Sequence, residues 1–219
     1  MNKNREEEEL ESLLQGYSMM LYFTGLMVLY EPDDACIDEF WRGGLLRRLP
    51  VRSRNPLFVS AAADLHGSCC PENVCLKRIK SDFLKLFIGT GKMSAPPYES
   101  FHLGKEKLLF DKETLEVKEF YKSYGWKFAL EGNIPDDHIG VEILFINRLI
   151  DTYISLDDEV CKREMRNEIA RFIERHPLKW SSEWKDMVVA NAETSAYRGI
   201  AKLIHASLVD ISDILKNWG

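Results

Sequence analysis

The chain has 219 residues, of which 45% are hydrophobic and 29% charged, and its formal net charge at pH 7 is -6. A folded chain of this size buries about 70% of the surface that its unfolded form exposes, so it forms a core without disulfide staples. The acidic balance argues against nucleic acid as a partner, because phosphate binding needs clustered lysine and arginine. The 8 prolines and 13 glycines are scattered, so we expect one domain over residues 1–219.

The beginning of the sequence predicts a buried first helix over residues 5–30. Its apolar run, residues 17–30, has 14 residues, fewer than the roughly 20 that cross a bilayer. Four consecutive glutamates precede this run, where a secretory signal would carry positive charge. Five cysteines, an odd number, suit a reducing compartment better than a disulfide framework. We therefore expect a cytoplasmic protein without a membrane span.

Helical periodicity dominates the rest of the chain, and alternating strand patterns are absent. The acidic residues 6–9 stand at the start of the first helix, where the positive end of the helix dipole favours them, and we expect further helices over the ranges 33–49, 56–65, 71–88, 157–174 and 181–192. A further helix starts near Thr194, and another runs from a cap at Asp111 to Gly125. The segment 89–111 reads as non-helical. The expected fold is an all-α bundle of about 8–10 helices.

The segment 133–142 has the sequence NIPDDHIGVE and predicts a helix start. Pro135 suits the first helical position, and Asp136 and Asp137 suit the positive end of the helix dipole. The apolar residues that follow predict that this helix lies at the centre of the fold. His138 and Glu142 share a helix face, so Glu142 could accept a hydrogen bond from the imidazole and orient a general base. The alternative is a capped helix start with a structural histidine.

Two other patterns are weaker candidates for chemistry. His66, Cys69, Cys70 and Cys75 are zinc-type ligands, but two of the cysteines are adjacent and no second pair follows, so small buried thiols are the simpler interpretation. The segment 89–92, Gly-Thr-Gly-Lys, lacks the spaced glycine and the Ser or Thr of a phosphate-binding loop. We expect a turn there.

Four segments in order resemble one known family. The acidic segment 133–142 is similar to the signature of the TorD/DmsD/NarJ family of molybdoenzyme maturation chaperones, nearest to its TorD/DmsD branch. Residues 82–89, DFLKLFIG, resemble the family's aromatic-x-x-Leu-Phe-x-Gly stretch, and residues 95–100, APPYES, resemble its Pro-Pro-Tyr-Glu-Ser box. Residues 172–180, FIERHPLKW, resemble its Phe-x-x-x-His-x-x-x-Trp helix junction. The similarity covers roughly residues 76–210.

The resemblance implies an all-helical, non-enzymatic cytoplasmic chaperone without a cofactor of its own. It would bind the twin-arginine signal peptide and the apo form of a molybdopterin oxidoreductase, whose catalytic subunit is the client, and aid cofactor insertion before export. Such a peptide is cationic and then apolar, so its receptor needs an apolar groove rimmed by carboxylates. The candidate peptide-binding residues are Phe83, Leu86, Phe87, Pro97, Tyr98, Glu99, Ser100, Pro135, Asp136, Asp137, His138 and Glu142. For the apolar members, ordinary core packing is the alternative.

Two functions from other classes stay open at this point. One is a metal- or phosphate-dependent enzyme that uses His138 and Glu142. The other is a structural subunit that docks on a partner through exposed helices. The sequence does not name the client enzyme, and it leaves monomer and homodimer equally open.

Overall fold

The computed structural model describes residues 2–37, 40–41, 48–68, 74–89, 92–104, 112–128 and 134–218. The helices are α1 (Asn2–Leu29), α2 (Asp34–Ile37), α3 (Pro56–Gly67), α4 (Val74–Phe83), the π-helical turn η3 (Leu84–Ile88), α5 (Glu99–Leu103), α6 (Lys112–Ser123), α7 (Ile139–Ser155), α8 (Glu159–Arg175), α9 (Pro177–Asn191) and α10 (Ser195–Asn217). No strand occurs in these ranges apart from one isolated β-bridge. The predicted all-α class is therefore confirmed.

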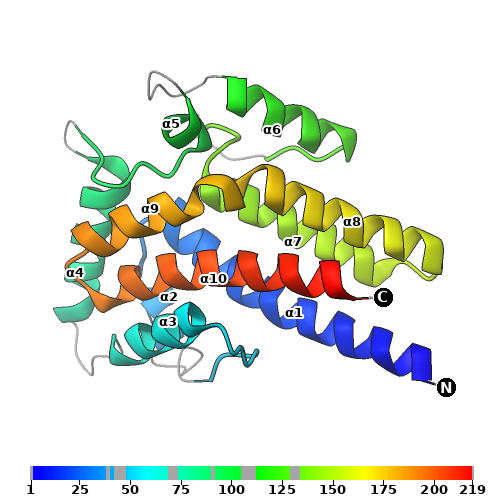
Figure 1. Cartoon of the computed structure of the whole chain (residues 1–219). Coiled ribbons are helices and arrows are strands. Elements are labelled where there is room, and N and C mark those ends of the chain that lie inside the picture. Colours follow the sequence, from blue (N-terminus) through cyan, green and yellow to red (C-terminus); the bar gives the residue numbers. More distant parts are fainter. Residues whose placement is uncertain are drawn as a thin grey trace.

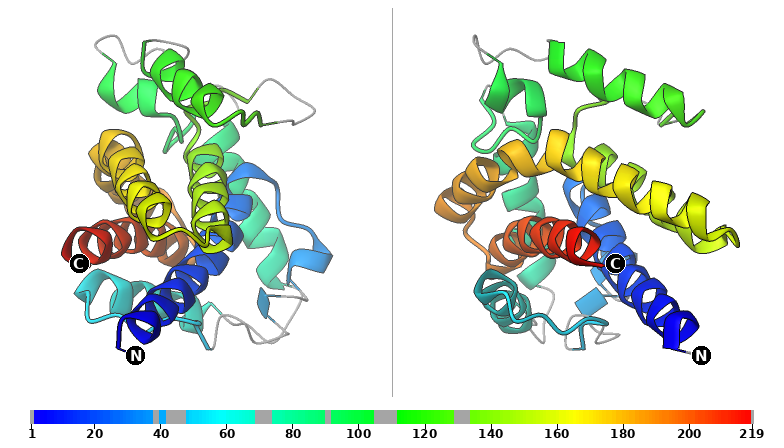
Figure 2. Two further views of the ribbon diagram at one scale, coloured as in Figure 1. Left: turned by 90° about the vertical axis from the view of Figure 1, so that its right-hand side faces the viewer. Right: turned by 45° about the vertical axis from the view of Figure 1, so that its right-hand side comes forward.

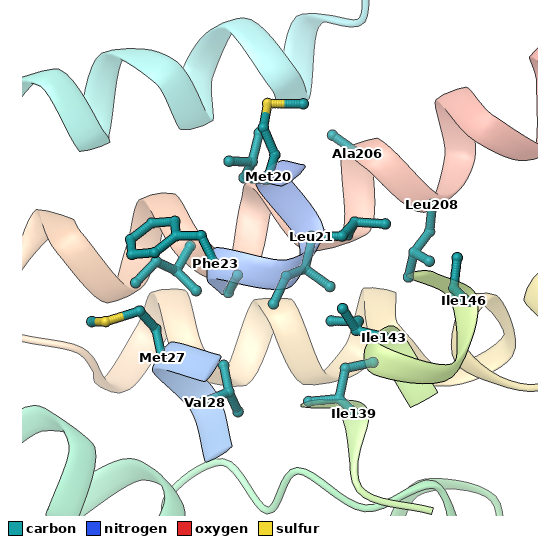
Figure 3. Close-up of a cluster of buried hydrophobic side chains, with 14 of the residues drawn as sticks. Met20, Leu21, Phe23, Met27, Val28, Ile139, Ile143, Ile146, Ala206 and Leu208 are labelled. Carbon is teal, nitrogen blue, oxygen red and sulfur yellow. The ribbon is translucent and has the colours of Figure 1, made fainter. Parts of the chain in front are cut away.

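The long helices pack side by side around α7 and α10 (Figures 1 and 2). α7 contacts α1 and α8, and α10 contacts α3, α9, α1 and α8. Most of α7 is buried, as its nearly uniform apolar sequence predicts. Met20, Leu21 and Met27 of α1 and Ile139 and Ile143 of α7 belong to one cluster of buried hydrophobic side chains (Figure 3).

Two glycines bring α1 and α7 into close contact. A Cβ atom on Gly140 would lie 2.4 Å from Cγ of Leu29 and 2.8 Å from the carbonyl oxygen of Gly25. A Cβ atom on Gly25 would lie 2.9 Å from Cγ2 of Ile143. Because glycine has no side chain, the two backbones approach at a distance that any other residue would prevent.

The acidic residues of α1 do not lie in the first turn of the helix, where the sequence places them. The helix begins at Asn2, so the glutamates lie beyond its first turn. Glu7 instead forms a shielded ion pair, with Oε2 3.0 Å from Nη1 of Arg166 on α8. By length and composition, the stretch Arg5–Leu29 could cross a membrane, since it contains an 18-residue window with a mean hydropathy of 1.2. However, 61% of that window is buried in the protein, as in a core helix.

The other helix predictions are mostly confirmed, with shifts at their ends. Asp158 caps α8 and Thr194 caps α10 through side-chain oxygens. α9 begins at Pro177, earlier than expected, because proline fits the first helical position. Gly125 follows α6 with φ +62°, as a residue past a helix end requires. The cap expected at residue 111 lies outside the described residues.

The first half of the chain departs from the expected pattern in two places. Of the helix expected over 33–49, α2 covers Asp34–Ile37, residues 40–41 are π-helical and residues 48–49 are not helical; positions 38–39 and 42–47 lie outside the described residues. The segment 89–111 contains a helix, α5, which the sequence pattern did not indicate. Its first turn is stabilised by a side chain from a distant part of the chain, as described next. The helix expected over 71–88 starts at Val74 within the described part of the chain and ends as η3.

Candidate functional site

Two of the sequence motifs meet in a short antiparallel bridge between Tyr98 and His138. The backbone N–H of Glu99 donates to the carbonyl of Asp137 at 3.0 Å, and the N–H of Ile139 donates to the carbonyl of Pro97 at 2.8 Å. This pairing joins the Pro-Pro-Tyr-Glu-Ser box to the acidic segment before α7. We call the residues 96–102, 135–142 and 176–180 the motif junction.

Asp137 supports α5 and not the helix that follows it. Its Oδ2 accepts a hydrogen bond from the backbone N–H of Ser100 at 2.8 Å, in the first turn of α5. The side chain is fully buried. The predicted helix start at Pro135 is therefore wrong, because residues 136–137 form a turn and α7 begins at Ile139. This contact between Asp137 and Ser100 spans 37 residues of sequence. It explains why the sequence pattern missed α5 and placed the start of α7 too early, because Asp137 stabilises α5 and not the helix to which it was assigned.

His138 is the N-cap of α7. Its Nδ1 accepts a hydrogen bond from the N–H of Gly140 at 3.0 Å, so the proton of the neutral ring is on Nε2. The ring packs edge-on against Tyr98, with centroids 5.2 Å apart. Burial lowers the pKa of His138 to about 3. The imidazole is therefore neutral at physiological pH and acts as a structural cap.

The predicted hydrogen bond from His138 to Glu142 is not formed. Among the residues that the structure describes, neither carboxyl oxygen of Glu142 has a hydrogen-bond partner, although the side chain is fully buried. Burial raises the pKa of Glu142 well above its usual range, and the negative charges of Glu99 and Asp137 raise it further. The raised pKa favours the protonated, neutral form of Glu142 in the folded protein. The orienting contact that a His138/Glu142 catalytic base requires is missing.

The helix-junction motif, residues 172–180, joins the motif junction through His176, which lies between α8 and α9. Its Nδ1 is 3.1 Å from Oε2 of Glu99, and both side chains are nearly inaccessible. Trp180, one turn further along α9, stacks on His102 with centroids 5.0 Å apart. Nε2 of His102 lies 2.9 Å from the carbonyl oxygen of Pro96. The three motifs, widely spaced in sequence, therefore form one connected polar and aromatic unit.

The candidate residues of the motif at residues 82–89 lie in the core. Phe83, Leu86 and Phe87 are at most 4% exposed. Phe87 packs against Trp184 at 6.2 Å and against Tyr197 at 5.4 Å between ring centroids. Their present role is the core packing that the sequence left open as the alternative. The motif's Asp82 accepts hydrogen bonds from the backbone N–H groups of Glu193 and Thr194, and so fixes the start of α10.

Burial separates the candidate peptide-binding residues into two groups. Tyr98 and Asp136 are partly exposed, and Lys118 of α6 lies 3.8 Å from Oδ2 of Asp136. The buried members of the set are Phe83, Leu86, Phe87, Pro97, Glu99, Ser100, Pro135, Asp137, His138 and Glu142. The junction thus presents only a narrow edge to solvent.

A hollow of about 630 Å³ lies beside the junction, between α6 and the α8–α9 connection. Its lining residues are Lys112, Leu115, Glu116, Glu119, Phe120, Arg175, His176 and Lys179. None of the candidate residues lines it. His176 could have been selected from the motif that contains it, whereas the α6 residues carry no sequence signal, because helix packing alone brings them to this place.

Within the described ranges, no group of three His, Cys, Asp or Glu side chains is arranged to hold a metal ion. His66 is exposed on α3. Cys69 and Cys70 lie outside the described residues, as does the side chain of Cys75. Of the segment 89–92, Gly89 has φ +66° and ends η3, while residues 90–91 are also outside the described part.

The described residues define an all-α protein built around a buried polar junction of three sequence motifs. The nitrate reductase delta subunit family matches residues 58–186, more than half of the chain, and the chain belongs to this family. The family inferred from the motifs is thereby confirmed, although the match begins and ends earlier than residues 76–210.

Named relatives show similarity over a comparable length of the chain. The chaperone protein TorD of Photobacterium profundum is 31% identical over 129 residues, which are 58% of this chain and 59% of the relative. TorD of Aliivibrio fischeri is 27% identical over 129 residues, with the same two coverages. The Tat proofreading chaperone DmsD of Salmonella typhimurium is 26% identical over 124 residues, 57% of this chain and 55% of the relative. The match spans little more than half the length of these relatives.

Proposed function

We propose that this protein is a cytoplasmic chaperone for one molybdopterin oxidoreductase. It binds the twin-arginine signal peptide and the apo form of that enzyme, and it aids cofactor insertion and assembly before export, without catalysing a reaction itself. Family membership supports this proposal, together with relatives named as TorD and DmsD chaperones. The observation that carries it is the motif junction, in which three of the four family-like motifs contact one another.

The charge of the junction suits a basic ligand. Two carboxyl groups, from Glu99 and Asp137, lie close enough to Glu142 that their negative charges raise its pKa. Asp136 adds a partly exposed carboxylate at the edge. A cationic peptide segment is attracted to such a region, and complementary charge mainly raises the rate and specificity of association.

We further propose that the buried candidate residues act indirectly on the peptide. Asp137 and His138 hold the bridge between the two motifs, and that bridge fixes the positions of Tyr98 and Asp136. The peptide then contacts the exposed edge formed by Tyr98 and Asp136. Phe83, Leu86 and Phe87 support this edge from the core.

Calorimetry with signal peptides tests the proposal. The probes are synthetic twin-arginine signal peptides of the molybdopterin oxidoreductases encoded in the same genome. We expect one of them to bind, and we expect Tyr98→Ala with Asp136→Ala to weaken its binding while the melting temperature changes little. Glu164→Ala, a change at an exposed position of α8, is the matched control. If none of the peptides binds and no apoenzyme is retained in co-expression, the proposed function is overturned.

A further inference from the structure

The hollow beside the motif junction has the size and the lining of a binding site. Its volume is about 630 Å³, and it lies between α6 and the α8–α9 connection, both of which can be followed in Figure 1. Ligand pockets in proteins typically have about 300–1,000 Å³. Three lining residues are apolar or aromatic, namely Leu115, which is 63% exposed, the half-buried Phe120 and the buried His176. The hollow therefore offers an apolar contact to a side chain of a partner.

Two cations on one wall of the hollow have no carboxylate partner. Arg175 ends α8, and Lys179 lies in the first turn of α9. Both are exposed, and neither forms an ion pair with any residue that the structure describes. Glu174, the sequence neighbour of Arg175, pairs instead with Lys216, at 2.6 Å between Oε1 and Nζ. This wall therefore carries two positive charges that the protein itself leaves unpaired.

The opposite wall, on α6, carries two carboxylates that are paired within the helix. Oε1 of Glu116 is 2.6 Å from Nζ of Lys112, and Oε1 of Glu119 is 2.5 Å from Nζ of Lys122. The pKa of Glu116 is lowered by its hydrogen bond with Lys112 and further by the charge of Lys179, which therefore acts across the hollow. The α6 acids are compensated locally, so the unpaired cations give the hollow its capacity for a carboxylate ligand.

α6 separates the hollow from the acidic edge at Asp136. Glu119 lines the hollow, whereas the hydroxyl of Tyr121 donates a hydrogen bond to the backbone carbonyl of Asp136 at 2.9 Å. Residues two positions apart do not share a helix face, so these two contacts lie on different sides of α6. The basic residues of a twin-arginine peptide are attracted to Asp136 and repelled by Arg175 and Lys179. The hollow therefore suits a segment of the client other than its signal peptide.

We propose that the hollow is a docking site for an acidic segment of the client apoenzyme, outside the signal peptide. An Asp or Glu carboxylate of that segment pairs with Arg175 and Lys179, and a neighbouring apolar side chain packs on Leu115 and Phe120. Arginine suits this role because its planar guanidinium pairs with a carboxylate through two parallel hydrogen bonds. This inference rests on the proposed function, and it adds a second contact surface of opposite charge to the edge proposed for the signal peptide.

Charge reversal provides the first test. The probe is the apoenzyme whose signal peptide binds in calorimetry, produced without that signal peptide and without the molybdenum cofactor. We expect the wild type to bind this probe in biolayer interferometry, and Arg175→Glu with Lys179→Glu to bind it about tenfold more weakly or worse. Affinity of the same variant for the signal peptide should not fall. Both side chains are exposed, so its melting temperature should be close to that of the wild type.

A matched variant controls for the change in net charge. Lys77→Glu with Arg78→Glu reverses an exposed lysine and an exposed arginine on α4, which does not line the hollow. This control should bind the probe as the wild type does. An equal loss of affinity in both variants would show that net charge alone is responsible, and would overturn the proposal.

Photo-crosslinking identifies the segment that enters the hollow. A benzophenone amino acid in place of the exposed Leu115 should crosslink to the apoenzyme, and mass spectrometry should place the crosslink in a segment that contains Asp or Glu. With the full-length apoenzyme, a crosslink to the signal peptide would overturn the proposal. A crosslink to a segment without an acidic residue would overturn it as well.

The outcomes separate this inference from the proposed function. If the wild type binds a signal peptide and the charge-reversed variant binds the probe as well as the wild type does, the docking site is refuted and the proposed function stands. If the wild type binds the signal peptide but not the probe, the docking site is refuted too, because the client is then held by its signal peptide alone. If neither a signal peptide nor an apoenzyme binds, the proposed function fails and the docking site fails with it.

Discussion

The buried cap of α7 predicts a specific loss of stability in mild acid. His138 is 4% exposed, and burial lowers its pKa from 6.5 to about 3. The folded protein therefore keeps the ring neutral between these values, while the unfolded chain takes up a proton. Stability from this residue is complete above pH 6.5 and is lost as the pH falls from 6.5 toward 3.

The size of the effect follows from the two pKa values. A pH of 5 lies 1.5 units below the ordinary pKa of 6.5, so His138 is protonated in the unfolded chain. In the folded protein the ring is still neutral at this pH. At about 1.4 kcal/mol per unit, His138 lowers the free energy of unfolding by about 2 kcal/mol between pH 7.5 and pH 5.

His138→Asn isolates this contribution, because asparagine is a good N-cap and does not titrate in this range. Urea unfolding, followed by tryptophan fluorescence at pH 7.5 and pH 5, gives the free energy of unfolding of each protein. We expect the wild type to lose about 2 kcal/mol more than the variant over this interval. Any constant cost of the smaller side chain cancels in the comparison. His66→Asn on the exposed side of α3 controls for the removal of a histidine as such. An equal difference between wild type and variant at the two pH values would refute the reasoning.

Two further substitutions test the core of the fold. Burial raises the pKa of Glu142, so the wild type loses stability as the pH rises above the ordinary pKa range of a glutamic acid. Glu142→Gln should therefore have a higher melting temperature than the wild type at pH 7.5, but little advantage at pH 4. A variant melting temperature at pH 7.5 that is equal to or lower than that of the wild type would contradict this. Gly140→Ala places a methyl group 2.4 Å from Leu29 and 2.8 Å from the carbonyl of Gly25, and should cost about 1–3 kcal/mol in chemical denaturation. Gly67→Ala is its control, because nothing lies within 4 Å of the added atom, and equal stability losses in the two variants would argue against the close helix contact.

The sequence by itself determined the fold class and the family. Apolar residues at steps of three and four predict amphipathic or buried helices, because that spacing places them on one face. Helix ends could be predicted where the capping residue is a sequence neighbour. Asp158 before α8, Thr194 before α10 and Gly125 after α6 act at short range, and each was found at or next to its expected place.

Only the tertiary structure decided how the motif residues are used. Asp137 and Ser100 are 37 positions apart, and His176 and Glu99 are 77 positions apart, so no local pattern predicts that they form hydrogen bonds. The exposure of each side chain was likewise undecided, since Phe87 in the core and Tyr22 on the surface are both aromatic residues within apolar helices. Periodicity gives the face of a helix on which a residue lies, whereas burial depends on which other helix covers that face.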